Sequence, residues 1–303
     1  MRIASTQYHS TMNTALQNAT GKLQQILQKM ATGQRHLLPS ESPVTNVRLS
    51  RLAREEAAFD QYRENIAVLQ NRLLQNEQYL QGMVNDMLSA RDLMVWAADG
   101  SNTSEDVRAM AASLRPIMDS IFYTANTKDA EGKYVFSGTL SDTPAITYDA
   151  AAPVGSRYTF TGNTGEQRVA VGHGITQPAN ISLSETADWL NRLESAYETL
   201  RVPGVNVNDP AVRAEIVATL DTLDVALDAT AGMIARLGGA QNILSTLDNN
   251  HASVSLANKQ AALILGQLDY ADAAVKLNGY SAAVEATQKA YSRISKLSLF
   301  DVL

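Results

Sequence analysis

The fold is decided by residues 59–97, which read FDQYRENIAVLQNRLLQNEQYLQGMVNDMLSARDLMVWA. Apolar side chains recur along this stretch at alternating spacings of four and three residues, which is the heptad pattern of helices that pack along a coiled-coil seam. The seam members are Phe59, Tyr62, Ile66, Leu69, Leu73, Asn76, Leu80, Met83, Met87, Ala90, Met94 and Ala97. We therefore predict a single helix over residues 43–98, roughly 80 Å long at 1.5 Å per residue. A helix of this length needs partner helices that cover its apolar stripe.

The same rhythm returns near both ends of the chain, over residues 5–32 and 270–298. These two predicted helices can pair with each other, but neither has a large core of its own, and isolated helices are marginal in water. We therefore expect them to be completed by assembly with other subunits. The predicted interface residues are Met12, Leu16, Leu23, Ile26 and Met30 in the first helix and Leu277, Tyr280, Val284, Tyr291 and Ile294 in the last.

The composition changes near residue 128, where Gly, Thr, Tyr and Val become frequent. Short alternating stretches at 133–137, 157–161 and 167–171 predict strands separated by glycine turns. We predict a mainly α fold, a long antiparallel helical bundle or coiled coil with a small β domain. The predicted parts are an N-terminal assembly helix and turn (1–42), the first half of a helical rod (43–129), a β-rich outer domain (130–183), the second half of the rod (184–268) and a C-terminal assembly helix (269–303).

Composition argues against several function classes. The chain has no cysteine, which excludes thiolate metal sites and thiol nucleophiles. Its four histidines are not spaced as a metal site, and no nucleophile with a base or phosphate loop emerges, so we expect neither enzymatic activity nor a cofactor. The sequence contains no run of eighteen apolar residues, so it predicts no membrane-spanning helix. The few scattered basic residues and the net charge of −6 fit nucleic-acid binding poorly.

Four segments resemble the family that contains flagellin and the hook-associated proteins. They are MRIASTQ (1–7), the proline-bracketed turn PSESP (39–43), DAEGKYVFSGT (129–139) and LDYADAAVKLNGYSAAVEATQKAYSRISKLSLFDVL (268–303). The PSESP turn and the ending around Ser298, Leu299 and Phe300 are more similar to the hook-associated members than to filament flagellin.

This resemblance implies a structural subunit of the bacterial flagellum, outside the cell, at the junction between hook and filament. The implied partners are flagellin, a neighbouring hook-associated protein on the hook side, further copies of the chain in a ring, and a cytoplasmic export chaperone at the C-terminal segment. The implied route is the flagellar type III export apparatus. Two alternatives stay open, namely filament flagellin itself and a secreted coiled-coil adhesin or effector with a β binding tip.

If the terminal helices join only on assembly, a single charged substitution in their seam should cause a severe assembly defect. We expect Leu23→Asp or Val284→Asp to block incorporation of the subunit while the rest of the chain stays folded. Burial of one aliphatic side chain stabilises by roughly 1.5–3 kcal/mol, and the loss recurs at every equivalent contact of a symmetric assembly. Motility and the protein content of purified hooks measure incorporation; a variant that assembles normally would refute the seam assignment.

Overall fold

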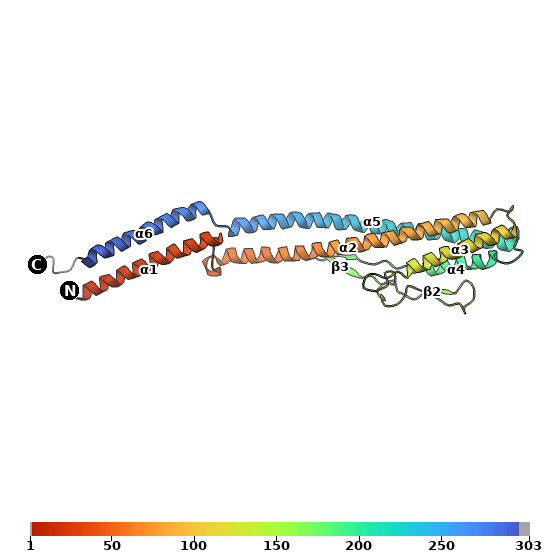
Figure 1. The fold of residues 1–303 in the computed structure, drawn as a ribbon, viewed down its shortest axis with the longest axis horizontal. Coiled ribbons are helices and arrows are strands. Elements are labelled where there is room, and N and C mark those ends of the chain that lie inside the picture. Colours follow the sequence, from red (N-terminus) through yellow and green to blue (C-terminus); the bar gives the residue numbers. More distant parts are fainter. Residues whose placement is uncertain (1, 297–303) are drawn as a thin grey trace. The chain divides into compact units, whose positions relative to one another are not determined.

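The computed structural model describes the backbone of residues 2–296 and the side chains of residue 7 and residues 9–293. Its elements are α1 (Arg2–Thr32), the 3-10 turn η1 (Pro39–Glu41), α2 (Pro43–Ala97), α3 (Ser104–Ala125), β1 (Ile146–Tyr148), β2 (Tyr158–Phe160), β3 (Arg168–Gly172), β4 (Ile175–Pro178), α4 (Thr186–Leu200), α5 (Pro210–Gly266) and α6 (Tyr270–Lys296) (Figure 1). The chain divides into two compact units. We call Met1–Ala58 with Ala252–Leu303 the terminal unit, and Phe59–His251 the central unit.

Helix α2 confirms the heptad prediction. It is one continuous helix of 55 residues that ends one residue before the predicted boundary. Ten of its predicted seam residues are buried, from Ile66 to Ala97. The polar member Asn76 is also buried, and its Nδ2 has no hydrogen-bond partner among the described residues.

Helix α5 runs antiparallel to α2 in the central unit. Arg63 Nε lies 2.8 Å from Asp248 Oδ1, and Arg91 Nε lies 2.6 Å from Asp224 Oδ1. Residue numbers thus rise along one helix as they fall along the other. Helices α3 and α4 pack against each other and contribute to the same core (Figure 1). The predicted antiparallel helical bundle is therefore confirmed.

The β-rich insert consists of two separate two-stranded antiparallel sheets, β1 with β2 and β3 with β4. The predicted strands at 157–161 and 167–171 correspond to β2 and β3. The predicted strand at 133–137 is wrong, since this segment makes only isolated bridges. Val135, Phe136 and Ser137 are consecutive and all buried, whereas alternate residues of a half-buried strand face solvent.

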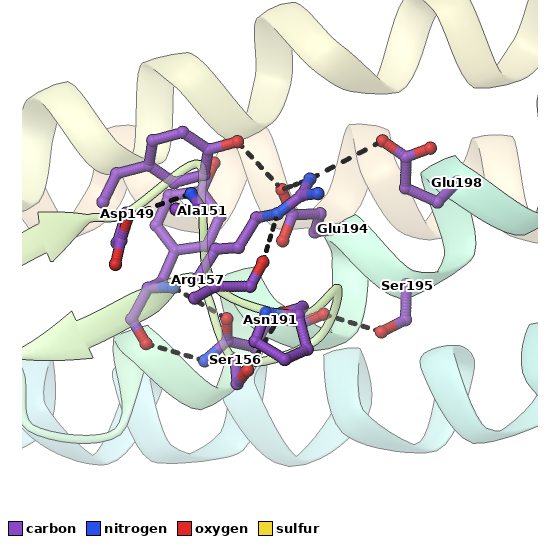
Figure 2. A network of polar contacts seen from close by, with 12 residues as sticks. Asp149, Ala151, Ser156, Arg157, Asn191, Glu194, Ser195 and Glu198 are labelled. Carbon is purple, nitrogen blue, oxygen red and sulfur yellow. Dashed lines mark hydrogen bonds and ion pairs between the residues drawn. The ribbon is translucent and has the colours of Figure 1, made fainter.

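A polar network fastens the β1–β2 hairpin to α4 (Figure 2). The Asn191 amide accepts from the Tyr158 backbone N–H at 2.9 Å and donates to the Tyr158 carbonyl at 2.8 Å, as a neighbouring strand would. Glu194 is fully buried; its Oε1 accepts from Arg157 Nη1 at 3.2 Å and from the Tyr148 hydroxyl at 3.3 Å. Burial raises the pKa of Tyr158 to about 12, so this ring is neutral near pH 7. The hairpin is thereby attached to the bundle by specific polar contacts as well as by apolar packing.

The β3–β4 hairpin is attached to the helices at a different place. His251 of α5 is buried, stacks near Phe59 and Tyr62, and has its Nε2 2.8 Å from the Val171 carbonyl. The Asn65 amide donates to the neighbouring carbonyl of the same strand at 2.9 Å. His251 therefore has a structural role here.

The α2 seam should carry much of the stability of the central unit. Leu80 is fully buried in the core, whereas the adjacent Gln81 is exposed. We expect Leu80→Ala to lower the free energy of unfolding by about 2–5 kcal/mol through lost apolar contact and a residual cavity, and Gln81→Ala to leave it nearly unchanged. Urea unfolding followed by circular dichroism measures both, and equal effects of the two variants would contradict the seam.

Candidate assembly interface

The terminal unit brings the predicted interface residues together between α1 and α6. Its small core contains Ile26, which is 6 % exposed, with Leu268 and Ala273. Four other predicted residues pack against this core, namely Leu23, Met30, Leu277 and Tyr280. The predicted pairing of the first and last helices is therefore confirmed, and its best-packed part lies at the end of α1 and the start of α6.

The rest of the seam is less complete. Met12, Leu16, Val284 and Tyr291 are each half-buried, and the Tyr291 ring lies edge-on to His9 with centroids 5.6 Å apart. Ile294 belongs to α6, but its side chain lies outside the described residues. Among the nine predicted residues whose side chains are described, Ile26 is thus the single buried one. The role of the ten residues in contacts between subunits stays a prediction.

Beyond this core the chain turns at what we call the elbow, residues 33–42 and 266–269. The Arg35 N–H donates to the Gly266 carbonyl at 2.8 Å, and the Leu268 N–H donates to the Gly33 carbonyl at 2.9 Å. Gly33 has a φ of 69°, and a Cβ there would lie 3.3 Å from the Tyr270 hydroxyl. Glycine therefore suits both the left-handed backbone and the close approach.

A single acid organises the PSESP turn within the elbow. Glu41 accepts from Lys29 Nζ at 2.6 Å and from Gln25 Nε2 at 2.9 Å, and lies 3.7 Å from His36 Nδ1. The hydrogen bond from Lys29 is the main cause that holds the pKa of Glu41 below its usual value. Sequence reasoning found the turn but missed this pair, because no fixed spacing links a residue of α1 to the turn that follows it.

Apolar side chains also cover parts of the terminal unit that face away from its core. Ile264 is 76 % exposed and Val275 is 72 % exposed. Other strongly exposed members are Leu38, Val44, Val47, Leu256 and Leu263. Periodicity missed them because they lie off the seams. These side chains offer apolar area that a contact with another protein can bury.

Neither a metal-ligand group nor a membrane-spanning helix is found in the described part of the chain. Among residues whose side chains are described, no group of three or more His, Cys, Asp or Glu could hold a metal ion. None of the helices, within the same limits, is long and apolar enough to cross a lipid bilayer.

Comparisons with known proteins show similarity to flagellar proteins. The family model described as the bacterial flagellin N-terminal helical region matches residues 3–141. Flagellar hook-associated protein 3 of Salmonella typhimurium is 23 % identical over 315 residues, which cover 100 % of this chain and 99 % of that protein. The Escherichia coli protein of the same name is also 23 % identical, with the same coverage.

The chain is similar over its whole length to flagellar hook-associated protein 3. Solved structures show the same similarity. A Vibrio parahaemolyticus structure assigned to the flagellar hook-associated proteins has a TM-score of 0.67 and 29 % identity, and the match covers 74 % of this chain and 99 % of that one. A flagellar junction protein from Legionella pneumophila has a TM-score of 0.59, at 14 % identity, over 72 % and 100 % of the two chains, which supports the shared fold. This chain therefore has the fold of these hook-associated proteins.

The Lys29–Glu41 pair predicts a pH dependence of the elbow. The folded-state pKa of Glu41 lies below its ordinary value of 4.5. The pair therefore stabilises the elbow above pH 4.5, and this contribution is lost as the pH falls from there through the folded-state pKa.

Lys29→Met should raise the pKa of Glu41 toward 4.5, whereas Lys22→Met, which removes an equal charge from the same helix, should shift it less. Carbon NMR of the carboxyl group in glutamate-labelled protein measures the pKa. An unchanged pKa in Lys29→Met would show that another group holds the carboxylate.

Proposed function

We propose that this protein is a structural subunit of the bacterial flagellum that forms the junction between hook and filament, outside the cell. The observation that carries the proposal is the match to hook-associated protein 3 over the whole chain. A structure of similar fold is itself named a flagellar junction protein. In this role the protein acts through its surfaces, and no bond is made or broken.

The terminal unit is the part suited to assembly. Of the predicted seam residues whose side chains are described, Ile26 is buried and several others are half-buried, so a neighbouring subunit can bury additional apolar area there. The exposed side chains of Ile264 and Val275 provide further apolar contact. We propose that the ten predicted seam residues become fully buried between subunits.

The finer partners follow from the same role. We propose self-association in a ring, a contact to a neighbouring hook-associated protein on the hook side, and a contact to flagellin on the other. We also propose export through the flagellar type III apparatus, with a cytoplasmic chaperone on the C-terminal segment before export. The resemblance of residues 268–303 to the C-terminal helix of hook-associated proteins supports this assignment.

Deletion of the gene tests the proposed role. We expect finished hooks without filaments, flagellin shed into the medium and loss of motility, because flagellin then lacks the surface on which to polymerise. Electron microscopy of the cells and analysis of the medium measure these outcomes. Two complementing genes test whether the N-terminal segment is needed for assembly. The gene for the full chain should restore filaments, whereas a gene that lacks the first thirty residues should not.

Normal filaments in the deletion strain would contradict the proposal. Hooks without filaments and without shed flagellin would instead indicate that the protein is the filament subunit.

A further inference from the structure

Charge is divided unequally between the two units. The terminal unit holds 12 Lys and Arg against 7 Asp and Glu, a net charge of +5. The central unit holds 13 Lys and Arg against 24 Asp and Glu, a net charge of −11. Two copies of the chain therefore attract each other when the terminal unit of one meets the central unit of the next.

Four of the twelve Lys and Arg residues of the terminal unit line one groove beside the elbow, which has a volume of about 590 Å³. The apolar residues of its lining are Ile26, Leu268 and Tyr280. The basic side chains that line it are Lys22, Lys29, Arg35 and Lys276, together with His36. The groove is thus a mainly polar surface with more basic than acidic side chains.

The two acids that line this groove, Asp269 and Asp272, are already engaged. Asp272 pairs with Lys276 at 2.6 Å, and Lys29 of the groove pairs with Glu41 outside it. Asp269 accepts from the Ala271 N–H at 2.9 Å and so caps the start of α6.

Two basic groups of the groove remain without an acidic partner. Neither Lys22 nor Arg35 makes an ion pair with any described residue, and both side chains are exposed. The bond to Asp272 raises the pKa of Lys276, while the charge of Arg35 acts in the opposite direction, which places like charges near each other. Such a groove favours carboxylates supplied from outside the terminal unit.

Two carboxylates of the central unit match this requirement. Asp60 and Glu64 lie one helical turn apart on α2, so they project from the same face. Both are exposed, and neither makes an ion pair within the described part of the chain. These two unpaired anions are complementary in charge to Lys22 and Arg35, the two unpaired cations of the groove.

We propose that the groove beside the elbow binds Asp60 and Glu64 of a neighbouring copy of this chain. The inference rests on the proposed function, since it requires copies that lie side by side in a ring. The proposed contact gives the groove a partner. It also explains why the two units carry net charges of opposite sign.

Charge reversal in the full-length protein tests the groove. Genes for Lys22→Glu with Arg35→Glu, for Asp60→Lys with Glu64→Lys, and for all four changes together are placed in cells that lack the chromosomal copy. The number of subunits on each purified hook is measured by quantitative mass spectrometry. Circular dichroism melting confirms folding, and the amount of protein in the medium confirms export.

Each double variant should occupy hooks about tenfold less than the natural protein, because like charges then meet in the contact. The fourfold variant should recover occupancy, because opposite charges meet again. The matched control is Arg48→Glu with Arg54→Glu, which makes the same charge change in the terminal unit at exposed residues outside the groove and should occupy hooks normally.

The outcomes separate this inference from the proposed function. Absence of the natural protein from hooks would overturn the proposed function. Natural occupancy by the groove variant, or a defect equal to that of the Arg48 and Arg54 control, would overturn the groove while the function stands. A defect that the fourfold variant does not repair would overturn the assignment of Asp60 and Glu64.

Discussion

The apolar stripe of α2 is the constraint on which the rest of the structure depends. A helix of 55 residues with a continuous heptad seam exposes far more apolar area than water tolerates, so it requires helices along its length. Helix α5 covers the stripe in antiparallel orientation, and α3 and α4 complete the core of the central unit. The two β hairpins then fold onto a bundle that is already determined.

The helices could be predicted from sequence because their signal is a repeated spacing of apolar residues. That spacing is the same whichever element packs against the helix. The strands were harder, because each has only three to five residues and two of the three predicted stretches matched. The segment around Phe136 failed because its side chains are buried consecutively under a folded loop. The attachment of the hairpins through Asn191, Glu194 and His251 had no sequence signal, since each polar group meets a partner distant along the chain.

The candidate interface also has features that could be predicted from sequence and features that could not. Periodicity located the seam residues of α1 and α6, and the structure brings Leu23, Met30, Leu277 and Tyr280 around Ile26. The elbow, the Lys29–Glu41 pair and the outward apolar side chains depend on how two connections lie together, which spacing along one helix does not encode.

The two seams differ in completeness, and this difference has a physical consequence. The α2 seam has ten buried members within one chain, whereas the predicted α1–α6 seam has one among its nine described side chains. The central unit therefore has a large internal core, whereas the α1–α6 pair has a small one to offset the entropy cost of ordering two helices. Additional apolar area from a neighbour raises the stability of that pair, so its order and the assembly of subunits are coupled. Opposite net charges on the two units add an orientation to this apolar contact, which alone would be non-directional.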